Sequence, residues 1–329
     1  MRDVLKRVCR GCQNPGFISK EEAYRTFKSI LEGKEDPVHV SAFLTGMRMR
    51  GESEDELEGL YEAVRKKIKI LEYKEKDRVD LALNYDGKVK TPHILPSALF
   101  IALSCGVKAS SHGTKGVPAK FGTTFFEVLS EMLGILPKSE EVFSINNFVY
   151  ADQSLFAEDL HKLLEIRKKL GFRTSINVIE KLLNPFLSEC IITSVAHDPY
   201  FEKVLNLCKK AGFKRILIVK GVEGSIEPYP DRKTKIMLNG EFLEVVPDIY
   251  DMGTDLPKGN FSVKEQAEIN IRILKGEEKD LSKWSVLTAS LIIYTSGSVK
   301  SFEEAVQLAK DSLLSGNAFH LYQEIKDSI

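Results

Sequence analysis

The sequence predicts a two-part α/β protein, in which a small N-terminal all-helical domain precedes a larger domain with a mostly parallel central sheet. The first 75 residues carry only helical patterns of apolar residues, whereas later segments alternate short apolar runs with amphipathic helices. The length of 329 residues also suits two domains better than one. We therefore expect a helical domain over residues 1–75 and an α/β domain over residues 76–329.

Helix-start and helix-stop residues delimit the elements of the first domain. Ser19–Glu22 and Ser53–Glu56 are capping boxes, in which a Ser side chain and a Glu three residues later satisfy the first backbone N–H groups. Between them, residues 37–50 have the helical spacing of apolar side chains, and Gly33 and Gly51 end helices. The pattern predicts consecutive short helices.

These helices carry more apolar residues than one buried stripe requires, and a helical domain of this size has a marginal core by itself. We therefore expect a homodimer in which two copies of the helical domain pack symmetrically. The surplus apolar residues are Phe27, Phe43, Leu44, Met47, Leu57, Leu60 and Tyr61.

After Tyr73 the pattern changes to strands that alternate with helices, which favours parallel pairing. Strands are expected at 77–83, 107–110, 190–195 and 215–219, and helices at 96–105, 125–133, 155–171 and 199–211. Segment 235–246 is the one clear hairpin, because Asn239-Gly240 at its centre favours a two-residue turn. Helices at 264–274 and 283–294 and a terminal helix from Ser301 complete the domain.

Charge and hydropathy exclude several classes of protein. Lys plus Arg and Asp plus Glu both number 47, so the chain as a whole does not attract nucleic acid or a membrane, although a local basic face remains open. No apolar run approaches the roughly 20 residues that span a bilayer, and the N-terminus lacks the apolar core of a signal peptide. We therefore expect a cytoplasmic protein without membrane contact.

The five cysteines are odd in number and scattered, which argues against a disulfide framework. Cys9 and Cys12 form a Cys-x-x-Cys pair, but no second pair or nearby His pair completes a zinc site. Ordinary reduced thiols are the expected interpretation, and a redox or metal role for this pair stays open.

Three stretches, in order along nearly the whole chain, carry a resemblance to a known family. They are Ile18-Ser-Lys-Glu-Glu-Ala with Met47-Arg-Met-Arg-Gly-Glu-Ser, then Ala102 to Gly113, then Arg167-Lys-Lys-Leu-Gly-Phe-Arg-Thr with Leu183-Asn-Pro. These stretches resemble segments of the anthranilate phosphoribosyltransferases, which belong to glycosyltransferase family 3. The resemblance implies the fold of that family, with the helix at 155–171 and the segment to Pro185 beside the small domain.

The loop that wraps the diphosphate in that family departs from its pattern here. Gly-Thr-Gly-Gly-Asp, whose backbone N–H groups approach the phosphates, aligns with Asn84-Tyr85-Asp86-Gly87-Lys88. A single glycine of the loop is retained, and Tyr85 adds a bulky ring. We expect the diphosphate site to be degraded.

Three further motifs of the family are altered. Asn-x-Ser-Thr, which holds phosphate at a helix start, aligns with His93-Ile-Leu-Pro, and Lys-His-Gly-Asn-Arg aligns with Ser111-His-Gly-Thr-Lys115. The magnesium-binding acids of Gly-Leu-Asp-Glu align with Ile226 and Glu227, so one carboxylate of two is missing. Because magnesium needs hard oxygen ligands, we expect weakened magnesium binding, no cofactor, and Glu227, the one retained candidate ligand, at the surface.

These departures resemble a side branch of the family, the YbiB-like proteins, in Asn84-Tyr-Asp-Gly-Lys, Ser194-Val-Ala-His-Asp-Pro and Lys220-Gly-Val-Glu-Gly-Ser. That resemblance implies the phosphoribosyltransferase fold, dimers formed through the helical domain, and binding of nucleic acid, DNA or RNA, instead of phosphoribosyl transfer.

Basic residues supply a candidate groove for anions. Loops that follow the expected strands crowd the cleft at the carboxyl ends of a parallel sheet, and they contain Lys88, Lys90, Lys108, Lys115 and Lys120. The helix at 155–171 and the residues after it add Lys162, Arg167, Lys168, Lys169 and Arg173. The cluster predicts surface contacts with a phosphate backbone, and the alternative of solvated charges balanced by acids elsewhere stays open.

Four residues have two interpretations each. His112 lines the floor of an anion-binding cleft, or it is a hydrogen-bonded structural residue. Tyr85 and Phe121 stack on bases, or they fill the place of the diphosphate. Arg173, which by resemblance contacts anthranilate, suits an aromatic acid or a phosphate. No residue is assigned a catalytic role.

The function expected from these residues is sequence-tolerant binding of nucleic acid, single-stranded above all, by a homodimer with a degraded phosphoribosyl-diphosphate site. One alternative is a glycosyltransferase or phosphoribosyltransferase that acts on an unknown aromatic or base substrate. Another is a structural or regulatory dimer that binds neither ligand. Anthranilate transfer is not expected in any of these cases.

Overall fold

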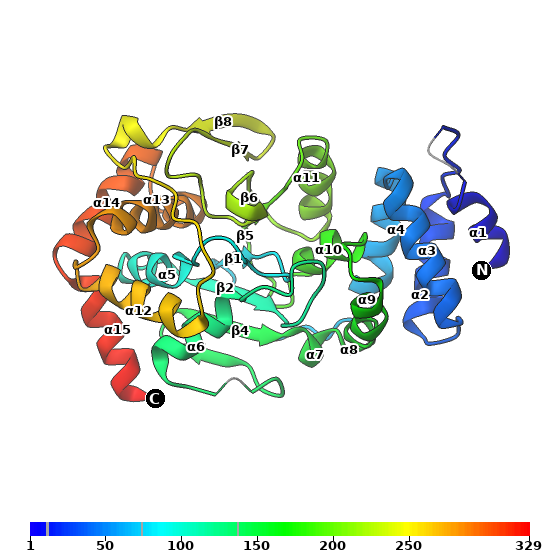
Figure 1. Ribbon diagram of the computed structural model, residues 1–329, viewed down its shortest axis with the longest axis horizontal. Coiled ribbons are helices and arrows are strands. Elements are labelled where there is room, and N and C mark those ends of the chain that lie inside the picture. Colours follow the sequence, from blue (N-terminus) through cyan, green and yellow to red (C-terminus); the bar gives the residue numbers. More distant parts are fainter. Residues whose placement is uncertain (11–12, 74, 137) are drawn as a thin grey trace.

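The computed structural model describes residues 1–10, 13–73, 75–136 and 138–329. The molecule is elongated, with a bundle of N-terminal helices at one end, the sheet in the middle and the C-terminal helices at the other end (Figure 1). Cys12 lies outside the described residues, and Cys9 is an exposed free thiol. The prediction for the Cys-x-x-Cys pair therefore stays untested.

The small domain contains α1 (Arg2–Val8), α2 (Lys20–Leu31), α3 (Pro37–Arg50) and α4 (Glu54–Arg65). Both expected capping boxes are present, because the Ser19 and Ser53 side chains accept the N–H groups of Glu22 and Glu56, whose carboxylates bond back to the caps. Asp36 caps α3 by accepting the N–H of Val38, the second helical residue. Local capping thus fixes where α2, α3 and α4 begin.

The apolar residues of these helices pack against one another inside a single chain. Phe27, Phe43, Leu44, Met47, Leu57, Leu60 and Tyr61 are at most 2% exposed. Their interpretation as surplus residues for a dimer contact is wrong, because they form one core with the neighbouring elements of the same chain. The homodimer itself stays a prediction.

In the described part of the chain, the centre of the large domain is an eight-stranded sheet of order β3-β4-β2-β1-β5-β6-β7-β8. The strands are β1 (Val79–Ala82), β2 (Ala109–Gly113), β3 (Phe143–Ile145), β4 (Phe148–Asp152), β5 (Cys190–Ser194), β6 (Arg215–Val219), β7 (Thr234–Leu238) and β8 (Glu241–Val245). Strands β4, β2, β1, β5 and β6 pair in parallel, and the outer β3, β7 and β8 pair antiparallel with their neighbours. The predicted mostly parallel sheet is confirmed.

The turns of the two hairpins in this sheet differ in the strength of their sequence signals. The expected one is confirmed: Asn239 and Gly240 join β7 to β8 with φ of 50° and 106°, as a turn with two left-handed residues requires. The hairpin of β3 and β4 was not expected. Its turn, Asn146-Asn147, has left-handed φ only at Asn146 and contains no glycine to mark it.

Helices cover both faces of the sheet (Figure 1). One face packs against α5 (Leu95–Ser104), α6 (Phe125–Leu133), α12 (Val263–Leu274), α13 (Lys279–Ser296), α14 (Phe302–Leu314) and α15 (Asn317–Ser328). The other packs against α10 (Ile176–Ile179), α11 (Tyr200–Lys210) and the small domain. Within β6, Leu217 faces the first core and Ile216 the second, as the two-residue period of a strand requires. No helix among the described residues is long and apolar enough to cross a bilayer.

The single helix expected at 155–171 is wrong. The segment forms α7 (Gln153–Phe156), α8 (Glu158–Lys162) and α9 (Leu164–Leu170), because Ala157 leaves helical geometry with φ −135° and ψ 52°. Its expected position is confirmed, since α9 contacts α3 and α10 contacts α4. The chain thereby returns to the small domain before it re-enters the sheet at β5.

Candidate functional site

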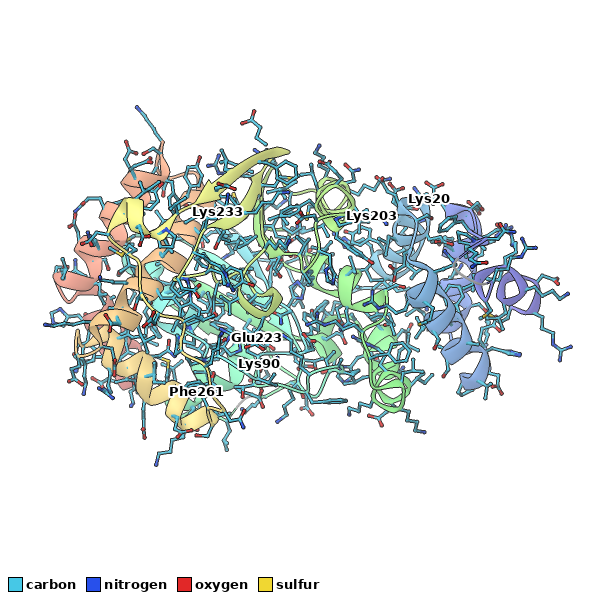
Figure 2. The ribbon with its side chains drawn as sticks, turned by 45° about the horizontal axis from the view of Figure 1, so that its top comes forward. Lys20, Lys90, Lys203, Glu223, Lys233 and Phe261 are labelled. Atoms are coloured by element: carbon cyan, nitrogen blue, oxygen red, sulfur yellow. The ribbon has the colours of Figure 1, made fainter. Side chains whose placement is uncertain are left out.

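The loops at the carboxyl ends of the parallel strands meet at the side of the sheet that faces the small domain (Figure 1). Lys203 donates to the backbone carbonyl of Glu52, and Lys210 pairs with Glu58 at 2.6 Å, so α11 is tied to the start of α4. Figure 2 shows Lys203 at this seam between the two parts of the molecule. The candidate site lies in these loops and along this seam.

Lys88 is buried and forms an ion pair with the buried carboxylate of Glu227. Its ammonium also donates to the carbonyl of Pro92 at 2.7 Å and lies 4.9 Å from the ring centre of Trp284. The expectation of a surface Lys88 is wrong, because the loop turns this side chain inward onto an acid.

Glu227 lies at the start of α5, where it accepts the N–H groups of Ile94 and Leu95 at 3.1 Å each. Burial alone would raise the pKa of this carboxyl group, but the charge of Lys88 and the nearby His93 hold its pKa at about 2. The expected surface position of Glu227 is therefore wrong. Both of its oxygens are engaged, one by a cation and the other by a helix N-terminus.

Glu223 organises the neighbouring loop with its carboxylate. It accepts the backbone N–H groups of Val89, Lys90 and Thr91 at 3.2, 3.0 and 2.9 Å, and the Thr91 hydroxyl at 2.9 Å. Burial opposes its charge, but these hydrogen bonds outweigh burial and lower the pKa of Glu223. Lys90 lies beside Glu223 in Figure 2, and its side chain is exposed. A carboxylate of the chain itself thus occupies this cradle of N–H groups.

The side chain of Lys120 joins two loops of the site and is not a freely exposed surface cation. Its ammonium donates to the carbonyls of Gly87 and Glu223 at 2.8 Å each, which joins two loops of the site. Burial lowers the pKa of Lys120 to about 8. Lys115, in contrast, is exposed and forms no ion pair with another described residue.

Tyr85 is buried beneath the loop, only 4% exposed. Its hydroxyl hydrogen-bonds His112 Nδ1 and donates to the carbonyl of Glu180 at 3.3 Å, and burial raises the pKa of Tyr85 well above its usual value. His112 is itself buried, with its Nε2 3.5 Å from Asp80. The burial of both residues and the hydrogen bond between them favour the structural interpretation of Tyr85 and His112.

The other predicted residues separate into exposed and paired groups. Phe121 is 50% exposed in a loop beside Val89. Arg167 is buried and forms a double ion pair with Glu180 at 2.7 and 2.8 Å, so it does not belong to a basic surface. Lys108 pairs with Asp77 at 3.1 Å at the opposite, amino end of the sheet. The last two placements contradict the predicted groove.

A pocket of about 110 Å³ opens along the seam between the two parts of the molecule. Three of the residues predicted for the vacated loop, Asn84, Tyr85 and Asp86, line it together with Arg173. Arg173 Nε donates to Asp86 at 2.7 Å, and its side chain remains about one-third exposed. The small domain contributes Arg48 and Glu52, and the remaining walls are Thr174, Asn177, Val178, Lys181, Ser194, Val195, Ala196, His197, Tyr200, Val204 and Gly224.

Lys181 is the most unusual residue of this pocket. It is only 7% exposed, donates to the carbonyl of Ser194 and lies 3.4 Å from the Ser194 hydroxyl. No described carboxylate forms an ion pair with it, in contrast to Lys88. Burial lowers the pKa of Lys181 to about 8. The sequence carries one signal for it, a lysine within the apolar run 176–185, and that signal was missed.

Comparison with known proteins finds two family models that together match most of the chain. The helical bundle domain of the glycosyl transferase family matches residues 2–68, and the a/b domain of that family matches residues 89–319. An uncharacterized protein of Aquifex aeolicus (strain VF5) is 39% identical over 92% of this chain and 96% of its own length. Anthranilate phosphoribosyltransferase of Geobacillus sp. (strain WCH70) is 25% identical over 98% of both chains.

Two solved structures share the fold. Anthranilate phosphoribosyltransferase from Saccharomyces cerevisiae, in complex with PRPP and Mg, superposes with a TM-score of 0.81 at 20% identity over 99% of this chain and 97% of its own. The enzyme from Thermus thermophilus superposes with a TM-score of 0.78 at 23% identity, over 99% and 98% of the two chains. At these identities the likeness concerns the fold alone.

Proposed function

The chain belongs to the glycosyl transferase family, and we propose that this member binds nucleic acid at the seam and does not transfer phosphoribosyl groups to anthranilate. Its relatives include anthranilate phosphoribosyltransferases, and one solved member of that group holds PRPP and Mg. The observation that carries the proposal is the contrast between a cradle filled by Lys88, Glu223 and Glu227 and a neighbouring pocket whose Lys181 has no carboxylate partner among the described residues.

The residues of the cradle do not fit magnesium. Magnesium binds hard oxygens in near-octahedral geometry, commonly through one or two carboxylates. Glu227 offers one carboxylate, Ile226 offers none, and the ammonium of Lys88 already lies against one oxygen of Glu227. A bound divalent cation next to this ammonium would be repelled. The acceleration of phosphoribosyl transfer by a metal-bound diphosphate is therefore not expected.

The support for nucleic-acid binding is a set of exposed cations in the pocket wall and on the loops at the carboxyl ends of two strands. Arg48 lines the pocket, and Lys90 and Lys115 extend from the loops after β1 and β2. All three are exposed, and none forms an ion pair within the described residues. Neutralising phosphates with such residues releases counterions, which gives sequence-independent affinity. Lys88, by contrast, no longer belongs to the proposed contact surface.

The test is a fluorescence-anisotropy titration of a labelled single-stranded oligonucleotide over a salt series. We expect binding that weakens steeply with salt, because each phosphate contact on a single strand contributes about −0.7 to the log–log slope. The triple variant Arg48→Glu, Lys90→Glu, Lys115→Glu should lose this binding. The matched control changes Lys209, Lys300 and Lys310 to Glu, since these lie on α11, just before α14 and on α14, outside the pocket.

Three results would overturn the proposal. Equal binding by the parent and the triple variant would place the contact elsewhere, and no binding by the parent at low salt would end the nucleic-acid function. Rescue of a tryptophan-requiring strain by this chain would show anthranilate transfer instead. The alternative, a transferase with an unknown aromatic or base substrate, is favoured by Arg173, whose guanidinium lines the pocket.

The homodimer belongs to the same proposal. The exposed surface of the small domain includes the apolar side chains of Phe17 and Val38, at 48% and 74% exposure. Two pockets held at a fixed distance would bind a long strand more tightly than a short one, because the second contact is intramolecular. Sedimentation that shows only monomer at micromolar concentration would contradict it.

A further inference from the structure

The pocket at the seam holds a buried positive charge without a negative partner. Lys181 lies in the short helix η1 (Glu180–Leu182), which follows α10 directly, and its ammonium reaches the carboxyl end of β5. Lysines are rarely buried this deeply unless a carboxylate accompanies them. The same cleft supplies the comparison, since Lys88 is also buried but rests on Glu227.

The hydrogen bonds of Lys181 leave donor capacity that the chain does not use. An ammonium carries three N–H donors, and the carbonyl and hydroxyl of Ser194 account for two. Glu180, the adjacent residue, cannot compensate the charge because Arg167 takes both of its carboxylate oxygens. An anion that enters the pocket would therefore find one buried donor and an uncompensated charge.

Arg173 provides a second donor group on the same pocket. Only its Nε is engaged, by Asp86, and within the described residues neither terminal nitrogen makes a hydrogen bond. Val178, Val195 and Tyr200 add apolar surface to the same pocket. The two carboxylates that also line it already have partners: Asp86 accepts from Arg173, and Glu52 accepts from the hydroxyls of Ser175 and Tyr200. The combination suits a ligand with a compact anionic end and a flat apolar body.

We propose that this pocket binds a phosphate monoester, carried by a mononucleotide or by the phosphorylated end of a strand, with its oxygens on Lys181 and Arg173. A monoester carries about −1.5 to −2 charges at neutral pH, whereas a phosphate inside a strand carries one. The monoester is also terminal, so it can reach a lysine that is only 7% exposed, whereas an internal phosphate is flanked by chain on both sides. For strand ends, the inference rests on the proposed function.

The first arm of the test compares adenosine 5′-monophosphate with adenosine by isothermal titration calorimetry. We expect the phosphate to improve affinity by about tenfold or more, the size of a charged hydrogen bond in a desolvated site. Lys181→Met should remove that gain, and the matched control Lys209→Met, an exposed lysine on α11, should keep it. If Lys181→Met fails to fold, Arg173→Gln decides, since this side chain is partly exposed and should also reduce the gain.

The second arm compares oligonucleotides of one sequence with 5′-phosphate and 5′-hydroxyl ends. Preference for the phosphate that disappears in Lys181→Met supports the inference. Oligonucleotides that bind without any preference for the phosphate end would overturn it and leave the proposed function intact. Monophosphate binding that depends on Lys181, with no oligonucleotide binding, would overturn the proposed function and keep the pocket as a nucleotide site. Equal affinity for adenosine and its monophosphate would reject the inference for both sources.

Discussion

Two buried lysines in one cleft, Lys88 and Lys181, have opposite surroundings. Lys88 lies against Glu227, which a helix N-terminus also stabilises, so both charges of that region are compensated. Lys181 has only the neutral oxygens of Ser194, and no described carboxylate pairs with it. Two kinds of site therefore lie side by side in the cleft: a cradle whose ligand positions the chain fills with its own groups, and a pocket that retains unsatisfied charge.

Substitution of Lys88, whose charge is compensated by Glu227, should give the largest change in the free energy of unfolding. Lys88→Met strands the buried charge of Glu227, and breaking a buried ion pair in this manner costs about 3–5 kcal/mol of unfolding free energy. Urea denaturation would measure it. The control Lys90→Met, in the same loop but exposed, should change stability by less than about 0.5 kcal/mol.

The same pair offers a rescue variant. Adding Glu227→Gln to Lys88→Met removes the stranded charge and keeps an oxygen for the N–H groups of Ile94 and Leu95, so part of the lost stability should return. If Lys88→Met proved as stable as the parent, the compensation that defines the filled cradle would be absent.

Substitution of Lys181, whose charge has no carboxylate partner among the described residues, should change the free energy of unfolding in the opposite direction. Burial lowers the pKa of Lys181 from 10.5 to about 8, so the folded state bears the desolvation of this charge. Lys181→Met should therefore stabilise the fold at neutral pH by up to about 3 kcal/mol, since each pKa unit is worth roughly 1.4 kcal/mol. Destabilisation of the order found for Lys88→Met would contradict the contrast between the two regions.

The pH dependence of this effect has a definite sign. Because the folded-state pKa of about 8 lies below the usual 10.5, the unfolded chain holds the Lys181 proton over the interval between them, and parent stability rises with pH there. After burial, the charges of Cys208, Arg173, Asp86 and Glu180 also act on the pKa of this lysine. The advantage of Lys181→Met over the parent should thus be full below pH 8 and vanish as the pH approaches 10.5. Urea midpoints measured for both proteins across this interval decide it.

Substitution of Glu223, an anionic residue of the filled cradle, should give a smaller change in the free energy of unfolding. Glu223→Gln places an NH₂ group where a carboxylate oxygen accepts backbone N–H groups, which should cost about 1–2 kcal/mol of unfolding free energy. Faster amide exchange at Val89, Lys90 and Thr91 would locate the loss in the loop that Glu223 holds. Glu277→Gln, an exposed carboxylate, is the matched control and should leave both quantities unchanged.

The fold was largely predictable because its signals are local. Ser19 and Ser53 with their partner glutamates set helix starts, and Asn239-Gly240 set the hairpin. The break at Ala157 was not predictable, since the residue itself favours helix and the chain leaves helical geometry there to reach the small domain. The short strands β3 and β4 lacked a turn marker of comparable strength.

The sequence predicted which residues form the site better than it predicted the partners of its charged side chains. Asn84, Tyr85, Asp86 and Arg173 do meet in one pocket. A lysine in a loop gives no sign of whether it faces solvent or an acid far away in the sequence, so the partners of Lys88 and Arg167 could not be found from the sequence. Glu223 was missed for the same reason, because its role depends on a loop more than 130 residues earlier.

Calorimetric titration of phosphoribosyl diphosphate, with and without magnesium, separates the filled cradle from the open pocket, because this compound carries both a diphosphate and a phosphate monoester. If the cradle is filled and the pocket is open, magnesium should not raise the affinity for phosphoribosyl diphosphate. The variant Lys181→Met should lower that affinity by about tenfold or more. An affinity that rises with magnesium and does not change in Lys181→Met would contradict this account. The diphosphate would then be bound at the cradle that Lys88 and Glu223 are said to fill.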